Sequence, residues 1–164
     1  MRQKFLLVLL FLLFNFSYAH EFWVEPSLYY PPINTRVDVR LWIGNNFSGK
    51  VMYARNPFHI QDFILINDGN VHKIEGIAGE YPSGWIDIGK YGIMIIAYNS
   101  NSTLSQLNAE KFEQYLQSEG LEEIIRIRAE KGESKQSGRE MYYRCAKSII
   151  ATQGTTTTKG YEQV

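Results

Sequence analysis

Histidine is the residue type in this sequence with the clearest potential for chemistry. His20 follows Ser17-Tyr18-Ala19, which places small residues at the −3 and −1 positions of a signal-peptidase cut. Cleavage after Ala19 would make His20 the N-terminal residue, so that its α-amine and its imidazole could chelate one metal ion together. The ordinary pKa values of these groups, about 7.7–8.0 and about 6.5, leave both available as neutral donors near neutral pH.

The other two histidines are candidate partners for His20. His59 follows Pro57-Phe58 in a predicted loop, and His72 lies in a predicted hairpin strand beside Lys73. No HxxxH or HExxH spacing joins the three, so a metal site at His20, His59 and His72 requires the fold to bring them together. The alternatives are a frayed terminus at His20 and a solvated sheet residue at His72. Amine and imidazole donors suit nickel, cobalt, zinc or copper.

Other kinds of chemistry have little support. The sequence contains no GxSxG motif, no cysteine–histidine pairing and no P-loop, which argues against nucleophilic and phosphoryl-transfer catalysis. Glu21 and Glu25 could add oxygen ligands near His20 or simply face water. The single cysteine, Cys145, excludes a disulfide within the chain and a cysteine-rich metal site, and we expect it to be a small buried hydrophobe.

The three tryptophans allow a second kind of binding. Trp23, Trp42 and Trp85 could form a platform on which sugar rings stack, as in an adhesion or carbohydrate-binding module. Large aromatic residues more often belong to a core or a half-buried sheet face, and this is the interpretation we favour.

Composition narrows the class of protein. The chain has 164 residues, of which 45% are hydrophobic and 14% aromatic, so it is not wholly disordered. Its 17 basic and 17 acidic residues cancel, which argues against nucleic acid as a partner. The length suits one domain.

The first 19 residues have the layout of a secretory signal peptide. A basic stretch, Met1–Lys4, precedes an apolar run from Phe5 to Phe14, which is too short for the roughly 20 residues of a membrane-spanning helix. We therefore predict a signal peptide over 1–19 and a periplasmic mature chain. Loss of Arg2 and Lys4 would leave that chain slightly acidic.

The first half of the predicted mature chain carries strand patterns. Residues 37–43 alternate apolar and polar side chains, and two apolar runs, 63–66 and 71–74, flank an Asp-Gly turn typical of a hairpin. Residues 85–88 and 93–98 predict two further strands. Short strands separated by glycine, proline and asparagine predict an antiparallel β-sandwich, immunoglobulin-like in class.

The second half has helical patterns. Asn108 is a good N-cap, and apolar spacing predicts a bent helix or a helix pair over 108–131, with an interruption at Gly120. We place this helical insertion after the last predicted strand of the sandwich. Residues 141–150 are ambiguous between helix and strand. The domain is expected to span 20–150, and the threonine-rich segment 151–164 is expected to be a disordered tail.

Several stretches together resemble a bacterial periplasmic family of domains of unknown function, which is associated with nickel or cobalt uptake and linked with Cna-B-like β domains. The resemblance rests on 19–26, on 39–44 and on four stretches of the second half: 107–112, 115–116, 119–121 and 139–147. It spans about 19–150. Members usually continue into a further β domain, so the resemblance implies that this chain is C-terminally truncated relative to them. Members often have a histidine after the glycine that closes the first strand, where this chain has Asn45 after Gly44.

The resemblance implies a non-enzymatic accessory protein of transition-metal uptake, with nickel or cobalt as cargo and copper as an alternative. His20 would supply amine and imidazole, with His59 or His72 as partners, and an inner- or outer-membrane transporter would receive the ion. Two other classes stay open: an adhesion or carbohydrate-binding module, and a copper redox enzyme with an N-terminal histidine brace.

Overall fold

The computed structural model describes residues 21–155, except for the side chains of residues 50–52. The predicted signal peptide, His20 and residues 156–164 lie outside the described residues. The chain divides into two units, a β-sandwich and a helical unit formed by residues 106–138. No helix in the described part of the chain is both long and apolar enough to cross a membrane.

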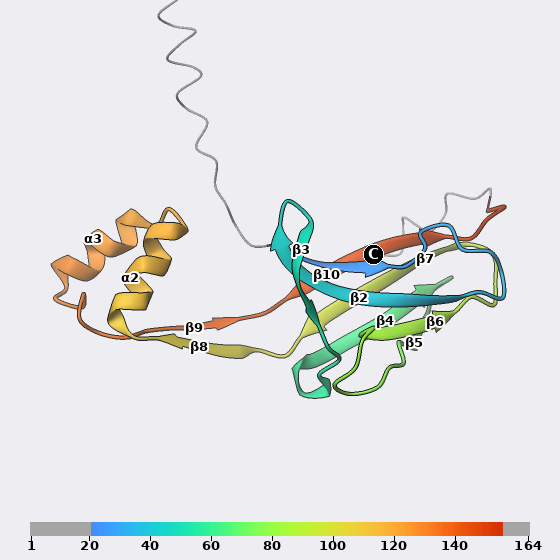
Figure 1. The fold of residues 1–164 in the computed structure, drawn as a ribbon, viewed down its shortest axis with the longest axis horizontal. Coiled ribbons are helices and arrows are strands. Elements are labelled where there is room, and N and C mark those ends of the chain that lie inside the picture. The colour runs from blue at the N-terminus through green and yellow to red at the C-terminus, as the bar shows by residue number, and fades with distance from the viewer. Residues whose placement is uncertain (1–20, 156–164) are drawn as a thin grey trace, which may run out of the picture. The chain divides into compact units, whose positions relative to one another are not determined.

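The first sheet of the sandwich is built around a long central strand. This strand, β2 (Arg36–Asn45), pairs with β1 (Glu21–Pro26) along one edge, and with β3 (Ser48–Tyr53) and β6 (Gly84–Asp87) along the other. All of these pairs are antiparallel (Figure 1). The alternation predicted for residues 37–43 is confirmed over 37–41, where Val37, Val39 and Leu41 are buried and the residues between them face outward. Ile43 is only half-buried.

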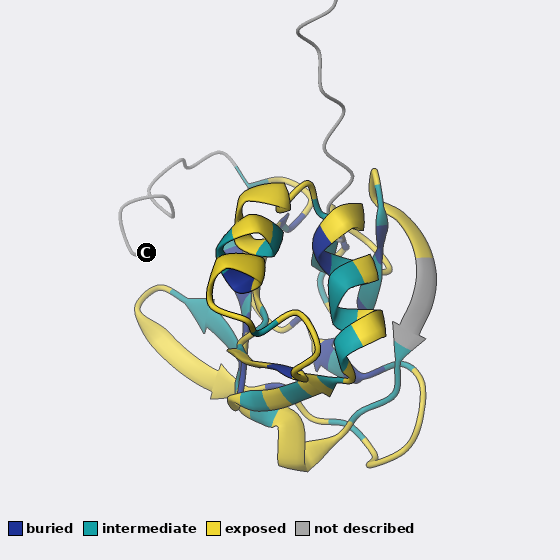
Figure 2. Ribbon diagram, turned by 90° about the vertical axis from the view of Figure 1, so that its left-hand side faces the viewer, coloured by how far each residue is buried: buried dark blue, intermediate teal, exposed yellow. Residues whose placement is uncertain are grey.

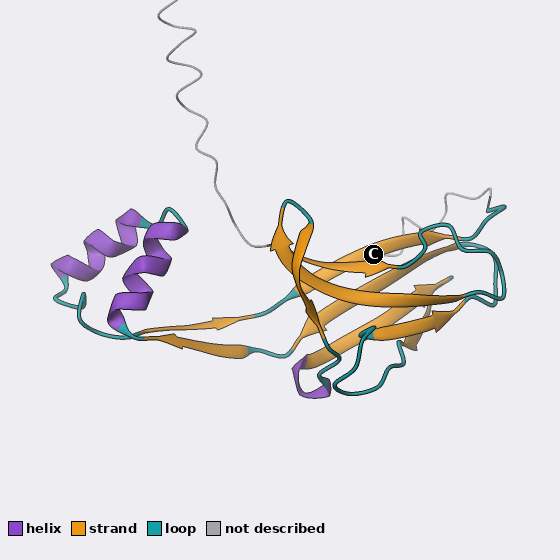
Figure 3. Cartoon of the chain, viewed as in Figure 1, coloured by secondary structure: helices purple, strands orange, loops and turns teal. Residues whose placement is uncertain are grey.

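The second sheet has the order β10-β7-β4-β5 and is also antiparallel. Its strands are β4 (Ile60–Asn67), β5 (Asn70–Lys73), β7 (Ile93–Ser100) and β10 (Cys145–Ala151). Asp68 and Gly69, both with positive φ, form the turn between β4 and β5, so the predicted hairpin is confirmed. Figure 3 shows these strands layered against the first sheet.

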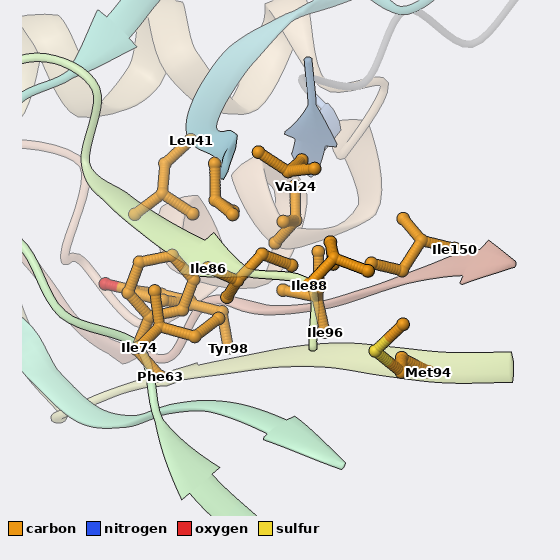
Figure 4. Packing of buried hydrophobic residues seen from close by; sticks show 12 residues of the cluster. Val24, Leu41, Phe63, Ile74, Ile86, Ile88, Met94, Ile96, Tyr98 and Ile150 are labelled. Carbon is orange, nitrogen blue, oxygen red and sulfur yellow. The ribbon is translucent and has the colours of Figure 1, made fainter. Parts of the chain in front are cut away.

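The core lies between the two sheets. Residues such as Val39, Ile96 and Ile150 have no solvent exposure, and Phe63 and Tyr98 complete the layer with an edge-to-face contact (Figure 4). Each fully buried Val or Ile side chain stabilises the fold by roughly 1.5–3 kcal/mol relative to an exposed one. The fold class predicted from the sequence, a mainly β antiparallel sandwich with a helical insertion, is confirmed.

The helical segment lies within the sandwich sequence, not after its last strand. It is flanked by β8 (Thr103–Leu107) and β9 (Gly138–Tyr142), which pair with each other, and the chain then returns to the second sheet as β10. The position expected for the insertion was wrong because residues 141–150, ambiguous in sequence, form strands. The boundary expected at 150 is also too early: Thr152 is buried and accepts a hydrogen bond from the Gly92 amide at 2.9 Å.

The helical unit is a pair of short helices, as predicted. Asn108 caps α2 (Ala109–Ser118), accepting a bond from the Lys111 amide at 2.9 Å, and Gly120, with φ of 69°, separates α2 from α3 (Glu122–Glu130). Most residues of both helices are exposed (Figure 2). Arg128 is buried: its guanidinium lies 4.8 Å from the Phe112 ring and donates to the carbonyls of Glu133 and Gln136.

Candidate functional site

A small cavity opens at the end of the sandwich where β1 begins. Its volume is about 70 Å³. Residues from both sheets and from β9 line it, because Phe22 is the second residue of β1 and His59 and Arg144 immediately precede β4 and β10. Aromatic walls come from Phe22, Tyr53, Tyr98 and Tyr142.

Arg144 is the charged group of this cavity. Its guanidinium carbon lies 4.9 Å from the ring centroid of Tyr142, 5.7 Å from Tyr53 and 5.8 Å from Phe22. The backbone is fixed, since Ser100 donates its amide to the Arg144 carbonyl and accepts the Arg144 amide at its hydroxyl. No side chain or carbonyl of the described residues accepts a hydrogen bond from the guanidinium. The surrounding aromatic rings attract the guanidinium charge, and its N–H groups can still donate to a ligand.

Tyr98 joins the cavity to the core. Its ring packs on Phe22 at 5.2 Å and on Phe63 at 5.6 Å, and its hydroxyl donates to the His59 carbonyl at 3.5 Å. Burial raises the pKa of the Tyr98 phenol, and the positive charge of Arg144 partly offsets that rise. The phenol is therefore a neutral donor at physiological pH.

His59 lies at this end of the sandwich, and His72 does not. His59 ends the short 3-10 helix η1 (Pro57–His59), is exposed and lines the cavity. His72 is an exposed residue of β5 and pairs with Leu65, five residues along β4 from Ile60. At about 3.3 Å per residue this separates the two histidines by roughly 17–20 Å along the strand.

That separation is far beyond the span of one metal ion, so the expected three-histidine site is wrong for His72. His72 lines a different cavity of about 290 Å³, whose other polar residues are Asn67, Lys73, Glu75, Asp87 and Lys90. The two lysines of that cavity are balanced by two carboxylates. No group of three or more His, Cys, Asp or Glu side chains suited to a metal ion occurs among residues 21–155.

The last residue of β2 carries an unsatisfied acceptor. Three buried side-chain atoms have no hydrogen-bond partner among the described residues, namely Oδ1 of Asn45, Oδ1 of Asn67 and Nε1 of Trp42. The register of β1 and β2 pairs Glu21 with Gly44 and Phe22 with Ile43. Asn45 is therefore the β2 residue next in line beyond the first described residue of β1. Buried acceptors are normally paired, so Oδ1 of Asn45 is available to a donor or a cation.

The tryptophans lie on the outer face of the first sheet, half-buried and outside the core. Trp23 and Trp42 are directly cross-strand, with ring centroids 6.4 Å apart and an interplanar angle of 19°, and Phe47 packs edge-on against Trp23 at 5.6 Å. Trp85 lies opposite Asp38, and the Arg36 guanidinium covers its ring at 5.3 Å.

Cys145 is exposed, which corrects the expectation of a buried residue. In β10 the side chains of Ser148 and Ile150 face the core, so the alternation of the strand turns Cys145 outward.

Sequence reasoning missed Arg144 and did not expect Asn45 to be an unpaired acceptor. The Tyr-Tyr-Arg run before β10 gives no periodic signal, and only the fold brings Phe22, Tyr53 and Ser100 to Arg144. The alternation of Phe22 and Val24 with Glu21, Trp23 and Glu25 was a signal that could have revealed β1 as a strand.

Comparison with protein-family models, with curated protein sequences and with solved structures yields no match. The resemblance to the nickel or cobalt uptake family therefore stays a prediction.

Proposed function

We propose that this protein is a non-enzymatic binding protein of the periplasm that captures a transition-metal ion, nickel or cobalt, at the end of the sandwich where β1 begins. Passive capture followed by delivery to a membrane transporter fits a site made of one chain terminus and a few side chains. The donors would be the α-amine and imidazole of His20 and the Oδ1 of Asn45, with His59 within the same end of the molecule.

The single observation that carries this proposal is the unpaired Oδ1 of Asn45 beside the start of β1. The described pairing of β1 with β2 ends with Glu21 opposite Gly44, the residue that immediately precedes Asn45. His59 lines the same cavity as Phe22, near the start of β1. We propose that the donors of His20 join these groups around one ion.

The donor set also indicates how strongly a metal would be held. Amine and imidazole nitrogens suit nickel, cobalt and copper, whereas an amide oxygen is a weaker donor for these ions than a second imidazole. Members of the family that the chain resembles often have histidine where this chain has Asn45. We therefore expect moderate affinity, as a carrier that must release its cargo requires.

Calorimetric titration of the exported protein, with its N-terminus verified by mass spectrometry, tests the proposal. Nickel and cobalt are each titrated into the wild type and into His20→Ala, which keeps an amine but loses the imidazole. We expect His20→Ala to bind at least about tenfold more weakly, a loss of about 1.4 kcal/mol. The matched control is His72→Ala, which removes a histidine at the far end of β4 and should leave the isotherm unchanged.

Two outcomes would overturn the proposal: identical isotherms for the wild type and His20→Ala, or a loss of binding in His72→Ala. The copper redox enzyme is a distinct outcome. Oxygen consumption by the copper-loaded protein with a reductant, abolished in His20→Ala, would assign the site to catalysis and exclude a passive carrier.

A second candidate function, saccharide binding, is favoured by one observation. Trp23, Trp42 and Phe47 form a contiguous aromatic cluster on the outer face of the first sheet. On the same face, the guanidinium of Arg40 lies 3.6 Å from the carboxylate of Glu25. Aromatic rings flanked by charged hydrogen-bonding groups suit a sugar ring. Glycan-array binding that is lost in Trp23→Ala, with metal binding unaffected, would support this function instead.

A further inference from the structure

We infer that the Arg144 cavity binds a carboxylate group, and that the protein takes its metal as a complex with a carboxylate-bearing chelator. The first half of this inference stands on the cavity alone. The second half rests on the proposed metal-binding function.

The inference that the cavity binds a carboxylate rests on the surroundings of the Arg144 guanidinium. Its guanidinium is half-buried among three aromatic rings and has no acceptor among the described residues. No aspartate or glutamate lines the cavity, whose polar groups come instead from Asn56, His59, Ser100, Thr103 and the tyrosines. A positively charged group that is partly removed from water without a counter-charge is costly, so an anionic ligand would bind here with little competition from the protein.

The geometry favours a carboxylate over other anions. The guanidinium donates to no acceptor among the described residues, and a planar carboxylate accepts two parallel hydrogen bonds from one edge of an arginine. The cavity, of about 70 Å³, leaves room for a small anionic group beside Arg144. A larger ligand would extend out of the cavity.

Elsewhere in the same sandwich, an arginine that lies over an aromatic ring does have a carboxylate partner. Arg36 lies over the Trp85 ring at 5.3 Å, and Asp87 accepts two hydrogen bonds from its guanidinium, at 2.8 Å and 2.7 Å. Arg144 likewise has aromatic rings around its guanidinium, but it has no carboxylate partner among the described residues. A ligand carboxylate would complete at Arg144 the arrangement that Asp87 completes at Arg36.

Charge connects the cavity to the proposed metal site. Arg144 lies 5.8 Å from the Phe22 ring, and position 20 is only two residues before Phe22. A bare divalent cation bound near the guanidinium would be repelled by its charge. A chelator carboxylate on Arg144 would neutralise that charge and leave its other donors for the metal.

The test uses citrate as the probe, titrated without metal into the exported protein and followed by calorimetry and amide chemical shifts. We expect saturable binding, weakened at least about tenfold in Arg144→Gln and also clearly weakened in Arg144→Lys, because a lysine keeps the charge but loses the planar fork. Arg40→Gln is the matched control, since it removes the same charge from the outer face of β2 and should not change citrate binding. Thermal unfolding of each variant confirms that it is folded.

The inference about the cavity is overturned if Arg144→Gln, folded, binds citrate as tightly as the wild type, if the wild type shows no saturable binding, or if inorganic phosphate competes as strongly as citrate. Should Arg144→Gln be unfolded, citrate protection of the Ser100 and Arg144 amides in the wild type decides in its place. Nickel titration in chelator-free buffer tests the proposed function separately. Citrate binding without any nickel binding would keep the carboxylate site and refute the metal complex, whereas nickel that binds equally with and without citrate would refute the complex alone.

Discussion

Arg36 and Arg144 occupy similar positions at two ends of one sandwich but differ in what surrounds them. Both guanidiniums lie over aromatic rings, that of Arg36 over Trp85 and that of Arg144 over Tyr142, Tyr53 and Phe22. Arg36 has Asp87 as a two-point partner and is 56% exposed at its side chain. Arg144 is more buried and has no partner among the described residues.

This difference indicates which of the two arginines is the better candidate for ligand binding. An exposed arginine with a carboxylate partner is complete, and its surface ion pair contributes little to stability. The half-buried Arg144 guanidinium lacks a hydrogen-bond acceptor among the described residues. The Oδ1 of Asn45, near the start of β1, is a second polar group without a hydrogen-bond partner there. Of the two, Arg144 lines the cavity, and an unpaired polar group in a cavity is typical of a binding site.

A carboxylate introduced into the cavity should pair with Arg144, as Asp87 pairs with Arg36. Thr103 lines the cavity and is half-buried, so Thr103→Glu would supply an acid within the site. We expect this variant to lose citrate binding by at least about tenfold, because the guanidinium is then already paired. Calorimetry measures the loss, and Thr103→Gln, which lacks the charge, is the control. Undiminished citrate binding in a folded Thr103→Glu protein would show that Arg144 is not the anchor.

Removing the carboxylate partner of Arg36 should not create a second citrate-binding site. Asp87→Asn leaves Arg36 over Trp85 without its carboxylate, but the side chain remains exposed to water. We expect no new citrate binding, since a water-exposed guanidinium gains little from an anion. A second saturable citrate site in Asp87→Asn would mean that an unpaired arginine on a ring suffices, and that the cavity adds nothing.

A histidine at position 45 should strengthen the metal site. Asn45→His replaces a weak amide donor with an imidazole, and we expect nickel affinity to rise by about tenfold, or about 1.4 kcal/mol. Asn45→Ala should bind a few-fold more weakly than the wild type. Both values come from calorimetric titration in chelator-free buffer. If all three proteins bind nickel equally, the Oδ1 of Asn45 does not contact the ion.

The ionisation of Tyr98 reports on Arg144 without any ligand. Because Arg144 lowers a pKa that burial raises, Arg144→Gln should raise the pKa of the Tyr98 phenol further. Ultraviolet difference spectra or ring NMR signals recorded through alkaline pH measure this shift. Bound citrate should move the wild-type value in the same direction. A fall of the Tyr98 pKa in Arg144→Gln would contradict the described position of the guanidinium.

The smallest effect is expected at Asp87. Its hydrogen bonds from Arg36 lower the pKa of the carboxyl, so the pair stabilises the fold above the ordinary pKa of an aspartate and this contribution is lost as pH falls through the lowered value. In Arg36→Gln the pKa of Asp87 should return toward its ordinary value, with little change in melting temperature at neutral pH. Carboxyl NMR titration checks the shift, and an unchanged Asp87 pKa would refute the pairing.

Much of the sandwich could be predicted from local patterns. The alternation of Val37, Val39 and Leu41 and the Asp68-Gly69 turn fix β2 and the β4–β5 hairpin, because period-2 burial and positive φ are local requirements. Asn108 likewise fixed the start of α2. The strand character of residues 141–150 was not visible, since β10 depends on pairing with β7.

The candidate site was harder to foresee. His20 and His59 were named from residue type, but the separation of His72 depends on its pairing with Leu65. Arg144 became a site residue only through Tyr53, which is far away in sequence, and through two hydrogen bonds with Ser100, one to its backbone amide and one to its hydroxyl. Contacts of long sequence separation carry no local pattern, so chain spacing gave no sign of them.

Paramagnetic broadening of amide NMR signals tests most directly that the functional end of the sandwich is the end where β1 begins. Copper or nickel is added in substoichiometric amounts to the isotopically labelled exported protein. The account predicts that the signals of Phe22, Asn45 and residues near them broaden first, while those of His72 and Asp87 stay sharp. Broadening centred on His72, or spread evenly over both ends, would contradict it.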